Sequence, residues 1–109
     1  MIESKTEACP LTASELTRSR EATLQYYIFE TKRVVYVERG EVEEAVKATE
    51  EMVHWSVVRE MLISEIIERL RNEAAIESGH DPGLPLSIDL NSLGNAAIIT
   101  WRAQDYDRY

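Results

Sequence analysis

The chain has 109 residues, of which 44% are apolar and 29% charged, and its formal net charge at pH 7 is −8. This length fits one globular domain and leaves too little for a second. No stretch approaches the roughly 18 apolar residues of a membrane span, and the negative charge disfavours direct binding to nucleic acid or to anionic membranes.

The opening residues, MIESKTEACPL, carry scattered charges and no apolar run. This is not the pattern of a secretory signal, so we expect a flexible N-terminus over residues 1–11 and a cytoplasmic protein. Cys9 is the only cysteine, and one chain therefore cannot form a disulfide or a zinc site built on paired cysteines.

A first helix is predicted to begin at about Ala13. Thr12 can cap the backbone N–H of Glu15, and the Glu15 side chain can in turn accept from the backbone N–H of Thr12. Leu11 can pack on Leu16 as a hydrophobic staple. The start of this helix is therefore well marked.

The extent of the first helix is ambiguous over residues 26–38, where YYIF and VVYV are rich in strand-favouring residues. The alternative is a β-hairpin around Thr31-Lys32, but that turn lacks the Gly, Asn or Pro that tight hairpins prefer. We favour a helix up to Arg39, closed by Gly40. One stripe at helical spacing supports it: Leu24, Tyr27, Ile28, Thr31, Val34 and Val35.

A second, long helix is predicted over residues 41–78, which contain no Pro and no Gly. It would be roughly 57 Å long at 1.5 Å per residue, more than one small sheet can cover. We therefore expect it to pack against the first helix as an antiparallel helical hairpin. Its predicted core face holds Val42, Ala45, Val46, Met52, Val53, Ile63, Ile66, Ile67, Leu70 and Ala74.

The C-terminal part, residues 86–103, reads as a short β-hairpin in which LSIDL and AAIITWR flank NSLGN. A helix over residues 92–103 is the alternative. We favour strands because Ile98, Ile99 and Thr100 are β-branched. The predicted fold class is thus α+β and predominantly helical, with one domain over residues 12–109.

The segment EMVHWSVVREML interrupts the polar face of the long helix with apolar residues. Either the helix breaks near Ser56, or it stays straight and a second copy of the chain buries this side. We favour the second explanation, since no Gly or Pro is present to make a break. The predicted interface residues are Trp55, Val58, Met61 and Leu62.

Ten carboxylates and four cations give residues 41–77 a net charge of −6. Within this segment Glu43, Glu44, Glu50 and Glu51 form a candidate surface for a basic partner. We therefore predict a protein-interaction module, an adaptor, an inhibitor or an accessory subunit, which acts as a homodimer or higher homo-oligomer. The negative charge of the long helix also permits an alternative, an inhibitor that mimics nucleic acid.

Glu51 and His54 match Glu-x-x-His, a spacing found in carboxylate-bridged di-iron bundles. A ferritin-like metal-binding bundle at a dimer seam is therefore a second alternative, although one such motif does not define a metal site. We assign no catalytic residue and no cofactor, because no nucleophile elbow, phosphate-binding loop or HExxH motif is present. Arg59 and Glu60 are expected to form a salt bridge between helices.

Overall fold

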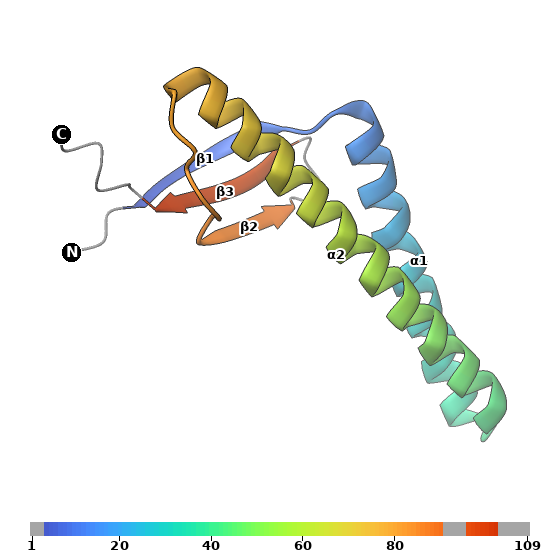
Figure 1. The fold of residues 1–109 in the computed structure, drawn as a ribbon. Helices are drawn as coiled ribbons and strands as arrows, with labels where there is room; N and C mark the ends of the chain where they lie inside the picture. Colours follow the sequence, from blue (N-terminus) through green and yellow to red (C-terminus); the bar gives the residue numbers. More distant parts are fainter. Residues whose placement is uncertain (1–3, 91–95, 103–109) are drawn as a thin grey trace.

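The computed structural model describes residues 4–90 and 96–102. Two helices and three strands follow one another as β1 (Ser4–Pro10), α1 (Ala13–Glu38), α2 (Val42–Ser78), β2 (Ser87–Leu90) and β3 (Ala96–Arg102). The helices form an antiparallel hairpin, and the sheet lies beside the C-terminal half of α2 (Figure 1). The predicted fold class, with its helical hairpin and its C-terminal pair of strands, is confirmed.

Helix α1 begins with the predicted capping box. The backbone N–H of Glu15 donates to Thr12 Oγ1 over 3.1 Å, and the backbone N–H of Thr12 donates to Glu15 Oε1 over 2.9 Å. The helix continues through residues 26–38, so the helical alternative for that segment is correct. Gly40 then adopts a φ of 71°, a left-handed conformation that glycine permits without steric cost.

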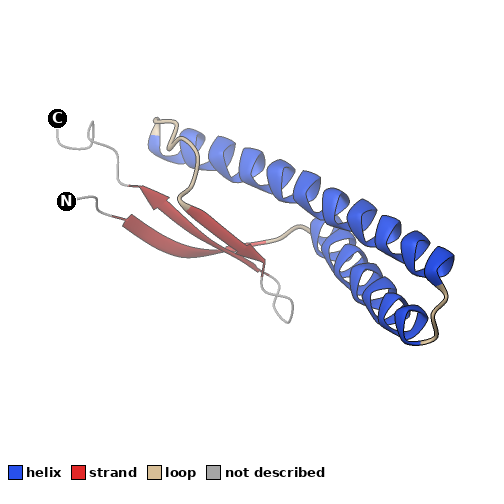
Figure 2. Cartoon of the chain, turned by 90° about the horizontal axis from the view of Figure 1, so that it is seen from below, coloured by secondary structure: helices blue, strands red, loops and turns tan. Residues whose placement is uncertain are grey.

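Helix α2 is a single helix of 37 residues that ends at Gly79, where φ is 80°. It continues through Ser56 without a break, which confirms the prediction of one continuous helix. The molecule measures 64 × 32 × 19 Å along its principal axes. The turned end of the hairpin therefore projects beyond the sheet (Figure 2).

Strand β3 lies at the centre of the sheet and pairs antiparallel with β1 on one side and β2 on the other. The strand alternative for the C-terminal segment is therefore correct for the described residues of β2 and β3; the turn residues 91–95 lie outside them. Ala97, Ile99 and Trp101 are buried, whereas Ile98 and Thr100 on the opposite face are only partly covered. One face of the sheet thus packs on the helices.

The expectation of a flexible N-terminus is wrong for residues 4–10, which form β1. Lys5 pairs with Trp101 and Cys9 with Ala97, so β1 forms the second edge strand of the sheet. The Trp101 indole Nε1–H also donates to Glu7 Oε1 over 2.8 Å. The sequence of β1 has little strand pattern of its own. Its pairing partner, β3, lies about ninety residues away in the sequence, so local patterns do not reveal the strand.

The hydrophobic core lies between α2 and the sheet. Leu62, Ile66 and Leu70 of α2 pack against a set of strand residues that comprises Leu90, Ala97, Ile99 and Trp101. Cys9 and Leu11 pack at its margin. The predicted core face is therefore correct for Ala45, Ile66 and Leu70 but wrong for Val42, Val46 and Val53, which are exposed.

The two helices meet along a seam whose residues recur at alternating spacings of three and four, the repeat of a coiled coil. On α2 the seam shares Ala45, Met52 and Ile66 with the predicted core face, and its other residues lie beside that face. The buried or half-buried residues at these spacings are Glu15, Ser19, Ala22, Tyr26, Phe29, Arg33 and Tyr36 on α1, and Ala45, Ala48, Met52, Trp55, Arg59, Leu62, Ile66 and Arg69 on α2.

An ion pair between Glu15 and Arg69 joins α1 to α2. The Arg69 guanidinium donates from Nε and Nη2 to the two carboxylate oxygens of Glu15, over 2.8 and 2.7 Å, in a bidentate arrangement. It also donates to the backbone carbonyl of Pro10 and to Glu73. Burial raises the pKa of Glu15, but hydrogen bonds from Arg69 and Thr12 outweigh it and hold the pKa below its usual range.

We expect Arg69→Ala to lower the free energy of unfolding by roughly 3 kcal/mol, because it leaves the carboxylate of Glu15 without its partner at a site that is 7% exposed. Arg18→Ala is the matched control. It removes the ion pair between Arg18 and Glu65, which is half exposed, and should cost less than about 1 kcal/mol. Urea unfolding measures both, and equal losses would contradict a special role for Glu15.

The same pair predicts how stability depends on pH. Because the pKa of Glu15 is lower in the folded than in the unfolded chain, its contribution is complete above about pH 4.3, the unfolded value, and is lost as the pH falls through the folded pKa. Wild type should therefore lose stability in acid more steeply than Glu15→Gln. Urea unfolding of both proteins at a series of acid pH values tests this, and parallel curves would refute it.

Candidate functional site

The part of the hairpin that extends beyond the sheet, residues 24–57, is here named the distal hairpin. Only Ala45 and Ala48 are buried within it. Both are small, so the two helices can approach closely there but remove little apolar surface from water. The large apolar residues of this region must therefore lie elsewhere than in the seam.

Nine large apolar side chains of the distal hairpin are exposed. On α1, the stripe that predicted a helix faces away from the seam and contributes Leu24, Tyr27, Ile28 and Val34. Val37 follows near the turn. On α2 the exposed residues recur mostly at spacings of three to four or seven: Val42, Val46, Val53 and Val57. Val42 and Val46 are 71% and 52% exposed, which is unusual for branched apolar residues in neighbouring turns.

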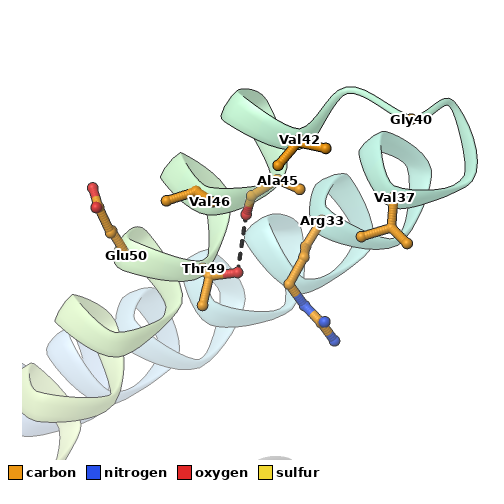
Figure 3. Close-up of a pocket in the computed structure, with 8 residues that line it drawn as sticks. All are labelled: Arg33, Val37, Gly40, Val42, Ala45, Val46, Thr49 and Glu50. Atoms are coloured by element: carbon orange, nitrogen blue, oxygen red, sulfur yellow. Dashed lines mark hydrogen bonds between the residues drawn. The ribbon is translucent and has the colours of Figure 1, made fainter.

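A pocket of about 340 Å³ lies near the turn of the hairpin, between Val37 of α1 and Val42 and Val46 of α2 (Figure 3). Its charged residues are Arg33 and Glu50, whose charged ends point away from one another in this view. The middle of the pocket is consequently apolar and its margins are polar. An apolar centre with a polar rim is also the usual composition of protein–protein interfaces.

The four predicted interface residues are not brought together on one surface. Met61 is 62% exposed, and Trp55 and Val58 are partly covered. Leu62, by contrast, is 3% exposed and belongs to the core beneath the sheet. The assignment of Leu62 to an interface with another chain is therefore corrected: the sheet of its own chain covers it.

The candidate acidic surface lies on the outside of α2. Glu43, Glu44, Glu50 and Glu51 are all exposed, and the Glu44 carboxylate lies 3.8 Å from Nζ of Lys47. His54 is also exposed, and its ring meets the edge of the Trp55 ring at a centroid distance of 5.2 Å. The described residues contain no cluster of three or more His, Cys, Asp or Glu side chains placed to hold a metal ion.

Two features that could carry chemistry are explained by packing. The pKa of the Cys9 thiol is raised by burial first and by the neighbouring Glu7 carboxylate second, which disfavours the reactive thiolate. Arg71 and Asp81 form a two-point ion pair that ties the segment after Gly79 to α2.

Comparisons of the chain with known protein families, with curated proteins and with solved structures found no match. Neither helix of the described part of the chain has an apolar stretch long enough to cross a membrane. The feature of the described chain that favours a binding site is the exposed apolar surface of the distal hairpin.

Adjacent residues of α2 should respond differently to truncation. We expect Leu62→Ala to lower the free energy of unfolding by about 3 kcal/mol, because it opens a cavity in the core, whereas Met61→Ala should change it by less than about 0.5 kcal/mol. Thermal or urea unfolding at low protein concentration measures both. A large loss for Met61→Ala would mean that Met61 is covered in solution.

Proposed function

We propose that the protein is a homo-oligomeric interaction module that associates with a second copy of itself through the distal hairpin. One observation carries the proposal: within the distal hairpin, nine large apolar side chains are exposed and only two alanines are buried. Val37, Val42 and Val46 line one pocket, and an exposed apolar patch of this kind is typical of a protein–protein contact. The role would be binding, as an adaptor, an inhibitor or an accessory subunit, and not catalysis.

The sheet supplies a physical precedent within the same molecule. The C-terminal half of α2 is covered by the sheet as well as by α1, and this third layer buries Leu62, Ile66 and Leu70. The distal hairpin has no such layer in the described chain. A second hairpin would provide it, and each valine that becomes fully buried would contribute about 1.5 kcal/mol or more.

The charges of the distal hairpin favour contact between unlike helices. Residues 24–40, from α1 into the turn, carry Lys32, Arg33 and Arg39 against Glu30 and Glu38, a net charge of +1. On α2, four carboxylates face one cation: Glu43, Glu44, Glu50 and Glu51 against Lys47. A two-fold arrangement that places α1 of one chain against α2 of the other would bring opposite charges together, whereas α2 against α2 would repel. The same acidic surface would steer a basic partner protein toward the assembly.

Val46→Glu should weaken self-association at least tenfold, because it places a charge in the apolar pocket near the turn and adds to an already acidic helix. Light scattering across a range of concentrations gives the molar mass. Wild type should run at a multiple of the 12.5 kDa of one chain, and Val46→Glu should shift toward a single chain.

Ile76→Glu is the matched control, since Ile76 is an apolar residue of the same helix, 86% exposed, outside the distal hairpin. It should leave the molar mass unchanged. A wild type that stays monomeric at every concentration would refute the proposal. So would dissociation caused by Ile76→Glu alone, because the contact would then lie at the other end of α2.

A further inference from the structure

A second pocket lies where the hairpin emerges from the sheet, next to the last residue of β2, Leu90. Its volume is about 430 Å³, within the range of sites that hold small molecules. Helix α1 contributes Ser19, Thr23, Tyr26 and Tyr27, and helix α2 contributes Trp55, Ser56 and Arg59. The walls are thus aromatic and hydroxyl-bearing, unlike the aliphatic pocket near the turn.

Two donors of this pocket lack a protein partner. Trp55 Nε1 is one of two buried side-chain nitrogen atoms of the described residues without a hydrogen-bond acceptor, the other being Arg33 Nε. Neither Arg59 nor Glu60 forms an ion pair within the described residues, so the salt bridge between helices that was expected for them is not observed. Trp55 and Arg59 are one helical turn apart and line the same pocket.

The two side chains differ in access from the pocket. The Trp55 Nε1 atom is buried, so an acceptor in the pocket does not reach it, whereas Arg59 is half-buried and lines the pocket without an ion-pair partner among the described residues. A guanidinium pairs best with a planar carboxylate, which it can contact at two points. The three aromatic rings, from Tyr26, Tyr27 and Trp55, present flat apolar surface beside these donors.

We propose that this pocket binds a small flat aromatic carboxylate. The carboxylate accepts from Arg59, and the ring system lies against Tyr26 and Trp55. This site goes beyond the self-association proposed above. It shares Tyr27 with the exposed surface of the distal hairpin, but Arg59 lies outside that segment and the valines near the turn do not line the pocket.

The indole N–H signals of the two tryptophans provide the test. Trp101 Nε1–H already donates to Glu7 and serves as an internal reference. The uniformly ¹⁵N-labelled full chain is titrated with 2-naphthoate, and with neutral 2-naphthamide as a control of the same shape. We expect 2-naphthoate to shift the Trp55 signal saturably while the Trp101 signal stays in place, and to bind at least tenfold more tightly than the amide.

Two variants distinguish the contribution of the Arg59 charge from that of the aromatic wall. Arg59→Gln should weaken 2-naphthoate binding about tenfold and leave that of 2-naphthamide unchanged, and Trp55→Phe, which keeps an aromatic wall, should weaken both several-fold. Calorimetric titration measures these affinities, and circular dichroism confirms that each variant is folded. Absence of a saturable shift, or equal affinity for acid and amide, would overturn the proposal. Because Val46→Glu should leave binding intact, loss of binding in that variant would also overturn it and would mean that the pocket belongs to the interface between chains.

Discussion

The mismatch in length between α2 and the sheet determines the shape of this molecule. A helix of 37 residues extends over roughly 55 Å, whereas strands of at most seven residues extend over roughly 23 Å. The sheet can therefore cover less than half of the helix. Helix α1 accompanies the remainder, but two helices alone form only one seam, and their outer faces have no third layer. The exposed valines of the distal hairpin follow from this constraint.

The Glu15–Arg69 pair lies within the part of the hairpin that the sheet covers, next to the core residue Leu70. Its guanidinium contacts α1 through Glu15, β1 through the Pro10 carbonyl and its own helix through Glu73. Because it links all three, it fixes the direction in which the hairpin leaves the sheet. The bidentate geometry and the capping role of Glu15 satisfy the carboxylate fully, and this is what makes such a pair tolerable at a nearly buried site.

The sequence predicted what depends on neighbouring residues and missed what depends on distant ones. The capping box, the glycine at each helix end and the absence of Pro or Gly within α2 are local signals, and the helices were placed correctly from them. Strand β1 was missed because Ser4–Pro10 has almost no strand pattern. A signal did exist in β3, whose AAIIT run is apolar on both faces, as is typical of a central strand with two neighbours. The prediction of the core face of α2 was partly wrong for a related reason. Periodicity shows that Val46 and Val53 share a face, but it does not show which face packs against the sheet.

The composition of the seam fits a surface that is completed by another molecule. A self-sufficient two-helix seam would use leucine and isoleucine, as the covered part of α2 does with Leu62 and Ile66. Over the distal hairpin the seam instead uses alanine and long amphipathic side chains such as Tyr26, Arg33 and Trp55, which tolerate partial exposure. Both buried nitrogen atoms without an acceptor, on Arg33 and Trp55, fall in this same region. Unsatisfied donors and uncovered valines thus occur in the same part of the described chain, and under the proposed self-association the partner chain would have to supply acceptors as well as apolar surface.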